Sequence, residues 1–521
     1  MAVDIVAIAA VSIAAYAASL SGYFLSDDFN IVTLLNAERT AVNWPNVLSD
    51  FYAVYRGDPT HSYYRPMITL SGAFDYSLWG PNPFGGHLTN LCFNMVNSLL
   101  VYGIAAALPP SPAGGFALLA GLLFSLHPLH AEPVYWLVGR TELIAACFSL
   151  LSILFSAVFL DRQRPVWRML SLMAFLLALG SKETAVVVPF AVTLHLLCFS
   201  ASGSERSPFR AAVHLTPYYL LLGAYFVFRK AITGHLIGQY GNTGTEPFVP
   251  SLIPKGIVHL VAYQLRPTGG ALLTSAGDAL VGQTVRRLID PLSWILLLAI
   301  VGLVIAVRID RRTWFCLGLM LVFAFPLLSL LAKTNLPIEL ARLYYLPSVA
   351  FCLFLAALLV KAPVLIARFL GLILVCSFAG LLAINSLPWI QAARITREIV
   401  QTIERVAYRP GVEKVLVIGN PDLYFGAELF GMNSWALEVA AGPPFAKIPA
   451  GVQVINLPLR PCAQSAAGVP PSSDGARVLR WDREHRRIEE VGMDQIRGNC
   501  RDFSPFLPRP EGKGRKGLRV D

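Results

Sequence analysis

The sequence predicts an all-α polytopic membrane protein with a small α/β domain at its C-terminus. Of its 521 residues, 55% are apolar and 14% are charged, whereas ordinary soluble domains have about 25% charged residues. The mean hydropathy is +0.57. Apolar runs of about 20 residues, long enough to cross a bilayer as a helix, recur from the N-terminus to about residue 385. These observations exclude a water-soluble globule, a collagen-like fibre and a disordered chain.

About eleven apolar segments are predicted to be transmembrane helices. The first, near residues 4–24, lacks a basic start and an obvious cleavage signal, so we interpret it as an uncleaved helix. A polar, aromatic-rich loop at 25–87 follows it. The other predicted helices lie near 90–108, 114–129, 141–160, 168–181, 184–200, 213–228, 291–308, 313–332, 345–361 and 364–385.

Basic residues in the short loops orient the chain, because Lys and Arg resist translocation. Alternation of the spans brings three basic loops to one side, which we assign to the cytoplasm. They contain Arg162, Arg164 and Arg168; Arg206 and Arg210; and Arg308, Arg311 and Arg312. The N-terminus is then cytoplasmic and the C-terminal tail lies outside a cell (inner) membrane. These loops also account for much of the net charge of +10 without a nucleic-acid partner.

We expect the membrane domain to cover residues 1–390 and an extracytoplasmic domain to cover 391–521. Apolar runs at 415–418 and 452–455 predict two short strands with a helix between them. Beyond about residue 461 the composition predicts partial disorder. In an oxidising compartment, Cys462 and Cys500 are a candidate disulfide.

Two outward segments need separate mention. Residues 252–265, within the 229–290 loop, are apolar but short and interrupted, which favours an interfacial helix over a span.

Asp27 and Asp28 lie a few residues beyond the outer end of the first span. One interpretation is a turn or helix N-cap. The other is a general base for an acceptor hydroxyl, because a carboxylate near a low-dielectric boundary and beside a second carboxylate has an increased proton affinity.

Arginines accompany aromatic residues at two predicted outer interfaces. Tyr64 and Arg65 precede the second span, and Arg342 and Tyr345 lie at the start of the tenth. Tyrosine is common at membrane interfaces, and a snorkelling arginine is ordinary there. The alternative is anion binding, because a guanidinium binds phosphate or carboxylate bidentately.

The 127–142 segment contains further ionisable residues: His127, His130, Glu132, Arg140 and Glu142. The intervening prolines exclude one regular helical face, and the His-Glu-x-x-His pattern is absent, so we expect no bound metal. Charged groups at the ends of membrane helices are costly unless they are paired or functional, which predicts a polar network lining a cavity.

Lys182 and Glu183 lie between two apolar segments and are candidates for the same network. The alternative interpretation is a simple surface salt bridge between them at a helix turn.

Taken together and in this order, these segments resemble the membrane region of the transmembrane and tetratricopeptide-repeat O-mannosyltransferases and, more distantly, the protein O-mannosyltransferases. Both have the GT-C glycosyltransferase fold. The tetratricopeptide repeats are replaced here by a tail of about 130 residues. The matching motifs are Asp27-Asp28, Tyr-Arg-Pro at 64–66, Leu-Trp-Gly-x-Asn-Pro-Phe-Gly at 78–85, His-Pro-x-His-x-Glu at 127–132, Gly-Arg-x-Glu-Leu at 139–143, Lys-Glu at 182–183 and Leu-Tyr-Tyr-Leu-Pro-Ser at 343–348.

The resemblance implies transfer of a sugar, with mannose as the family's sugar, from a polyprenyl-phosphate donor to a protein, lipid or glycan hydroxyl, with inversion. It implies that Asp27 is the base and that Asp28 holds the acceptor or polarises Asp27. Arg342 is the first choice for the leaving phosphate, ahead of Arg140, Lys182 and Arg65. No cofactor is expected, although related enzymes differ in their use of a divalent cation. The remaining cavity or acceptor candidates are His127, His130, Glu132, Glu142, Glu183, Tyr64 and Tyr345.

Two other functions compete with this one. A transporter or lipid flippase would also have many spans and buried charges, but broken helices with charges at the bilayer midplane are expected there. A non-catalytic scaffold for envelope assembly would act through its tail. The charges in this sequence gather at the predicted outer ends of the spans, which favours the enzyme.

Overall fold

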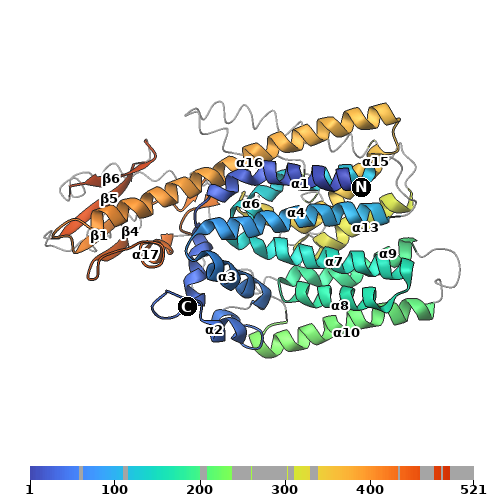
Figure 1. Ribbon diagram of the computed structural model, residues 1–521, viewed down its shortest axis with the longest axis horizontal. Helices are drawn as coiled ribbons and strands as arrows, with labels where there is room; N and C mark the ends of the chain where they lie inside the picture. The colour runs from blue at the N-terminus through green and yellow to red at the C-terminus, as the bar shows by residue number, and fades with distance from the viewer. Residues whose placement is uncertain are drawn as a thin grey trace, which may run out of the picture.

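The computed structural model describes most of the membrane region and much of the tail (Figure 1). Several predictions lie outside the described residues: the candidate Cys462–Cys500 disulfide, all but one residue of the span near 291–308, and all but two residues of 252–265. The described residues are 1–57, 63–108, 115–199, 208–236, 260, 264, 302, 310–328, 338–431, 434–457, 475–482 and 485–492.

The membrane region is a bundle of helices aligned with the long axis of the molecule (Figure 1). Six of the described helical segments are long and apolar enough to cross a membrane, and shorter apolar helices lie among them. The protein is therefore a mostly helical membrane protein. The helices are α1 (Ala2–Tyr16), α4 (Pro83–Ala107), α5 (Phe116–Ser125), α7 (Arg140–Arg162), α8 (Pro165–Leu179), α9 (Val188–Phe199), α10 (Pro208–Thr233), α13 (Arg311–Ala324), α15 (Tyr345–Leu359) and α16 (Val364–Ala407).

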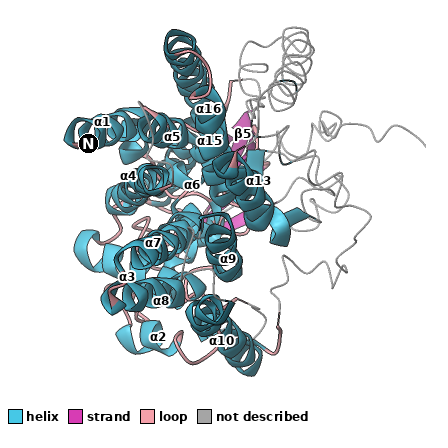
Figure 2. Ribbon diagram, turned by 90° about the vertical axis from the view of Figure 1, so that its right-hand side faces the viewer, coloured by secondary structure: helices cyan, strands magenta, loops and turns pink. Residues whose placement is uncertain are grey.

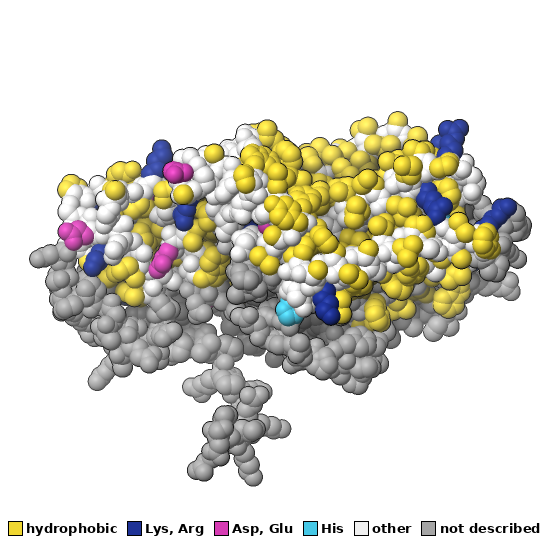
Figure 3. Space-filling view, turned by 90° about the horizontal axis from the view of Figure 1, so that it is seen from below, with side chains coloured by type: hydrophobic (Ala, Val, Ile, Leu, Met, Phe, Trp, Pro, Cys, Tyr) yellow, Lys and Arg dark blue, Asp and Glu magenta, His cyan; other side chains and the backbone are white. Residues whose placement is uncertain are grey.

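Helix α15 lies in the core of the bundle, where it packs against α5 and α13 (Figure 2). All of its residues are buried, as expected for a helix that is apolar on every side. The first half of α16 has the opposite environment, because Leu365, Phe369 and Leu372 are exposed. Figure 3 shows a broad apolar surface over the bundle, as a lipid-facing surface requires.

The two ends of the bundle differ in character. Met1 lies at one end, and the tail sheet lies at the other (Figure 1). Near the Met1 end, Arg312 donates to the Leu108 carbonyl over 3.4 Å and Arg168 donates to the Val213 carbonyl over 2.6 Å. In Figure 3, Lys and Arg side chains are visible at that edge without Asp or Glu beside them, whereas both kinds of charge are visible toward the tail. The basic loops described here therefore share one end, as the alternation of spans predicts.

The 25–87 loop is folded. It contains the 3₁₀ helix η2 (Ser26–Leu34) and the helices α2 (Trp44–Ser49) and α3 (Pro66–Trp79). Asn43 caps α2 by accepting a hydrogen bond from the Asn46 amide. Thr69 of α3 donates to the Asp50 carboxylate over 2.5 Å, which ties α3 to the end of α2.

Helix α16 continues to Ala407 without a break at residue 390. The domain boundary expected at residues 390–391 therefore lies inside one helix. The helix continues because its second half is amphipathic, with Ile395, Ile399 and Ile403 buried.

The tail forms a four-stranded sheet in the order β4-β1-β5-β6. Strands β1 (Lys414–Ile418) and β4 (Gln453–Leu457) confirm the two predicted strands, and α17 (Leu437–Ala440) lies between them. Strand β1 pairs in parallel with both β4 and β5, whereas β6 is antiparallel to β5.

Beyond about residue 461, where we expect partial disorder, the structure describes two segments of the tail. Strands β5 (Ala476–Asp482) and β6 (Arg487–Val491) form an ordered antiparallel pair. Their polar composition hid them from the sequence analysis, because pairing with β1 supplies the backbone hydrogen bonds of β5 whatever its side chains are.

Candidate functional site

Asp28 joins the first loop to the 130–140 turn. Its Oδ2 accepts a hydrogen bond from the Leu25 amide, and its Oδ1 accepts one from the Val138 amide, each over 2.9 Å. Burial raises the pKa of Asp28 to about 8, although the two amide hydrogen bonds act in the opposite direction. Both oxygens are therefore engaged in holding the backbone. Asp28 is not the N-cap, because η2 begins at Ser26 and Asp28 is its third residue; its carboxylate accepts from the amide of Leu25, which is the N-cap.

Asp27 is only partly buried and follows an unusual residue. Ser26 has a φ of +45°, a left-handed conformation that costs a residue other than glycine about 1–2 kcal/mol. The tail stabilises this conformation, because the Ser26 amide donates to the Leu429 carbonyl over 2.7 Å and the Ser26 hydroxyl donates to the Glu428 carboxylate. The tail thus fixes the backbone that leads into Asp27.

Glu132 and Arg342 form a buried ion pair near the same loop. The Arg342 amide donates to Glu132 Oε2 over 2.8 Å, and the Arg342 guanidinium donates to Glu132 Oε1. The guanidinium lies 4.8 Å from the Trp136 ring centroid, and Trp136 donates to the Leu25 carbonyl over 3.1 Å. A continuous chain of contacts therefore connects Arg342 to the loop that contains Asp27.

Glu428 links the two sides of this region. Burial raises the pKa of Glu428; the charge of Asp27 acts in the same direction, and Arg342 acts in the opposite direction. The packing is consistent with the effect of Arg342. Glu428 lies in strand β3 (Ala427–Glu428), which packs against the 3₁₀ helix η11 (Ile338–Tyr344), and η11 contains Arg342. Glu428 therefore lies close enough to both Asp27 and Arg342 to be affected by their charges.

Three further ion pairs join segments that are distant in the sequence. Lys182 is bound to Glu142, and these side chains are 2% and 4% exposed. Arg65 is 2.8 Å from Glu183. Arg140 is 2.6 Å from Asp75.

The alternative interpretation, a surface salt bridge between Lys182 and Glu183, is wrong, because the two residues pair with different segments of the chain. Lys182 binds Glu142, whereas Glu183 binds Arg65 and lies 3.8 Å from Arg229. The sequence analysis also missed Asp75, Arg229 and Glu428. Charged residues next to an apolar span were the available signal for Arg229; Asp75 and Glu428 had none.

Exposure separates the four basic candidates for a phosphate ligand. The Arg342 side chain is 20% exposed, compared with 12% for Arg65, 7% for Arg140 and 2% for Lys182. Arg342 is therefore the most exposed of the four, whereas Lys182 is enclosed with its partner Glu142.

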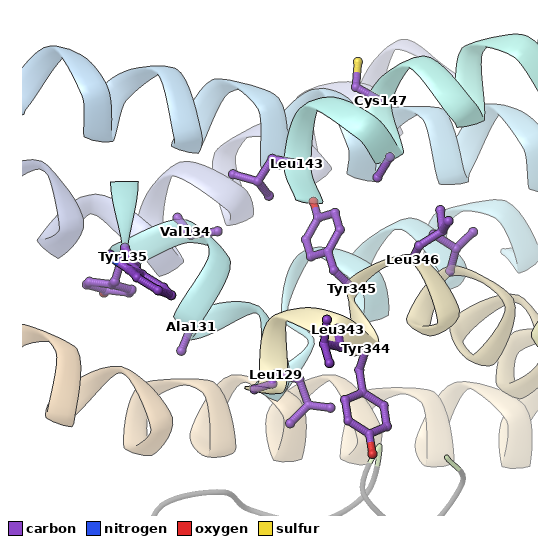
Figure 4. Packing of buried hydrophobic residues seen from close by; sticks show 14 of the residues in the cluster. Leu129, Ala131, Val134, Tyr135, Leu143, Cys147, Leu343, Tyr344, Tyr345 and Leu346 are labelled. Carbon is purple, nitrogen blue, oxygen red and sulfur yellow. The ribbon is translucent and has the colours of Figure 1, made fainter. Parts of the chain in front are cut away.

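His127, His130 and Tyr345 lie in the bundle core, where none of them is exposed. The Tyr345 hydroxyl donates to Asn94 and accepts from Asn97, and it points toward the start of α7 at Leu143 (Figure 4). His130 Nε2 is 2.8 Å from the Ser348 hydroxyl. These residues connect α4, the 130–140 turn and α15 rather than lining an open surface.

Tyr64 packs elsewhere. Its hydroxyl donates to the Phe51 carbonyl over 3.2 Å, and its ring packs against Tyr225 and Phe228 of α10. It therefore braces the first loop against α10.

Within the described ranges, the one group of His, Cys, Asp or Glu side chains close enough to share a metal ion is Asp482, His485 and Glu489. It lies on the β5–β6 pair of the tail, away from the predicted site. Glu132 is the acidic residue of the predicted 127–132 motif, and both of its carboxylate oxygens accept hydrogen bonds from Arg342.

The fold and the paired ionisable residues define a polytopic membrane protein with a polar site at one end of its bundle. Residues 63–228 match the model of a family described as dolichyl-phosphate-mannose-protein mannosyltransferase. The similarity to that family lies in this segment, which is less than half of the chain. The matched range contains the Arg65, Glu132, Arg140 and Lys182 positions, and it excludes Asp27 and Arg342.

Curated relatives agree with the family match. The chain is 35% identical over 200 residues to the protein O-mannosyl-transferase Tmtc1 of Drosophila melanogaster, and 31% identical over 220 residues to TMTC1 of Mus musculus. These matches cover 37% and 40% of this chain, but only 22% and 23% of the relatives. The similarity is therefore to the membrane region, as the motifs indicated, and the chain spans less than a quarter of each relative.

Two solved structures are similar at low sequence identity. The oligosaccharyltransferase of Archaeoglobus fulgidus aligns over 92% of this chain and 67% of its own, with 11% identity and a TM-score of 0.45. ArnT of Cupriavidus metallidurans, solved with undecaprenyl phosphate, aligns over 93% of both chains, with 15% identity and a TM-score of 0.39.

Proposed function

We propose that this chain transfers a sugar from a polyprenyl-phosphate donor to an acceptor hydroxyl at the outer face of the membrane that it spans. The observation that carries the proposal is the convergence of the motif segments at one end of the bundle, through the contacts of Asp28 with Val138, Glu132 with Arg342, and Arg65 with Glu183. The family match over 63–228 supports the donor class, because that family is described by a polyprenyl-phosphate sugar.

In the proposed reaction, the Asp27 carboxylate accepts the proton of the acceptor hydroxyl. The acceptor oxygen then bonds to the anomeric carbon as the bond from that carbon to the phosphate oxygen breaks. The lipid phosphate leaves with an additional negative charge, and Arg342 stabilises it. Attack from the face opposite the leaving group inverts the anomeric centre. Mannose is the sugar we propose, with a protein, lipid or glycan as acceptor.

Asp28 and the other ion pairs have supporting roles in this proposal. Asp28 holds the loop that carries Asp27, through its two amide hydrogen bonds. Glu132 fixes the Arg342 guanidinium in place by accepting from both its side chain and its backbone. A preorganised charge stabilises a transition state better than a mobile one, because it needs no rearrangement during the reaction.

Arg342→Ala is expected to raise the KM for the lipid donor by about tenfold and to lower kcat by about 10²–10³-fold, the effect of removing one oxyanion-stabilising group. The KM for the acceptor should change little. The measurement is transfer of a labelled sugar in membranes supplied with polyprenyl-phosphate donors.

Two further variants separate chemistry from packing in the Arg342 experiment. Arg409→Ala removes an exposed tail arginine paired with Glu490 and should leave both KM values unchanged. Arg342→Ala leaves the buried Glu132 carboxylate without its partner. The double variant Arg342→Ala/Glu132→Gln removes that carboxylate as well, and it should remain defective in sugar transfer. If the double variant transferred sugar normally, or if donor and acceptor KM rose equally, Arg342 would be a purely structural residue.

We further propose a GT-C arrangement of about eleven spans, with the N-terminus in the cytoplasm. Cysteines placed at Asp58 and Asp474 are expected to react with an impermeant maleimide added outside intact cells, above the background of the parent chain. A cysteine at Arg164 should react only after the membrane is opened. Labelling of Arg164→Cys from outside would overturn the orientation.

A further inference from the structure

A short hairpin of the tail lies against the loop that carries Asp27. It consists of β2 (Leu423–Tyr424) and β3, paired antiparallel. The hairpin packs on α16, and β3 also contacts η11. The tail therefore reaches both the first loop and the segment that contains Arg342.

Ser26 is one of the residues that attach the loop to the tail; another is Arg39, which donates to the Pro443 carbonyl over 2.9 Å. The side chain and the backbone of Ser26 both donate to the tail, to Glu428 and Leu429 respectively. The packing is close, because a Cβ added at Gly431 would lie 3.2 Å from the Ser26 hydroxyl and 2.2 Å from Trp435 Nε1. Ser26 is fully buried in this contact.

The contact has a direct consequence for the next residue. Ser26 begins η2 with a φ of +45°, and a backbone conformation of this kind persists only when its surroundings enforce it. Glu428 and Leu429 supply two of the enforcing hydrogen bonds. Loss of either bond allows the backbone at Ser26 to relax, and Asp27 moves with it.

We propose that Glu428 is a positioning residue for Asp27, acting through the Ser26 hydroxyl, and that the tail is an integral part of the site rather than an attached module. This inference rests on the proposed function, in which Asp27 is the base. The tail replaces no catalytic group; it fixes the direction of one.

The kinetic test compares Glu428→Ala, Ser26→Ala and the double variant. Each single variant is expected to lower kcat by about 10- to 100-fold, the cost of misplacing a reacting group, with an unchanged KM for the donor. The double variant should be no worse than either single variant, because each single variant already removes the same hydrogen bond between Ser26 and Glu428. Glu428→Gln should recover most of the activity, since its amide oxygen still accepts from Ser26.

A control and a second measurement make the result decisive. Glu490→Ala removes a tail carboxylate that pairs with Arg409, and it should leave kcat unchanged. Hydrogen exchange of the 24–35 amides should rise in Glu428→Ala and Ser26→Ala and remain normal in Glu490→Ala. Wild-type exchange and turnover in both single variants, additive losses in the double variant, or a Gln variant as poor as the Ala variant would overturn the inference.

The exchange result also separates this inference from the proposed function. If the wild-type protein transferred no sugar from any polyprenyl-phosphate donor, the proposed function would fail. Faster exchange in Glu428→Ala would still support the contact between the tail and the loop, whereas unchanged exchange would reject it.

Discussion

Replacing Asp27 with Asn is expected to abolish sugar transfer, with turnover lower by about 10²–10⁴-fold, the usual contribution of a positioned general base. The amide has the size of the carboxylate but does not accept the acceptor proton. Folding should survive, because the backbone contacts of this loop come from Ser26 and Asp28. Transfer of a labelled sugar in membranes, normalised to the amount of inserted protein, measures the effect.

The matched control for this experiment is Asp161→Asn. Asp161 is an exposed carboxylate near the end of α7, close to the predicted cytoplasmic loop, so the same chemical change there should leave turnover unaffected. Normal turnover by Asp27→Asn would reject the assignment of the base. Equal losses in both variants would show that any lost carboxylate impairs the assay.

Replacing Lys182 with Met is expected to destabilise the protein by about 3–5 kcal/mol, because it leaves the buried Glu142 carboxylate without its partner. The two side chains are 2% and 4% exposed, so water cannot replace the lost ammonium group. Chemical denaturation in detergent micelles, followed by tertiary-structure signals, measures the change.

The double variant Lys182→Met/Glu142→Met distinguishes a buried charge effect from a general packing effect. It should regain most of the lost stability, since apolar replacement of both members of a buried pair is often neutral. Arg409→Met breaks an ion pair whose side chains are 51% and 32% exposed, and it should cost less than about 1 kcal/mol. If the single and double variants were equally unstable, the loss of stability would come from packing rather than from an unpaired buried charge.

The position of the helices could be predicted closely from the sequence. The span predicted near 141–160 is α7, Arg140–Arg162, and the span predicted near 345–361 is α15, Tyr345–Leu359. Hydropathy succeeds here because the cost of placing polar groups in a bilayer applies to each segment separately. The order of the motifs also indicated the resemblance to a family, because each motif is a short run of residues that can be recognised without knowing how the segments pack.

The pairing of the charged residues could not be predicted in this way. Lys182 and Glu183 are neighbours in the sequence, yet Lys182 binds Glu142 and Glu183 binds Arg65. Hydropathy indicates that a charge emerges at the end of a span, but the partner depends on which helices pack together. The same reason hid Glu428, which lies in a polar tail 402 residues from its partner Ser26.

Two adjacent carboxylates illustrate the difference most clearly. Residue type does not distinguish Asp27 from Asp28, and only the resemblance implies that Asp27 is the base. In the structure, Asp28 is buried with both oxygens accepting from amides, whereas Asp27 is partly exposed. The sequence by itself determined a helical membrane protein with its ionisable groups at the ends of the spans, because burial in lipid is decided segment by segment. Only the tertiary structure decided which charges meet and which carboxylate is accessible, because those contacts join segments that are distant along the chain.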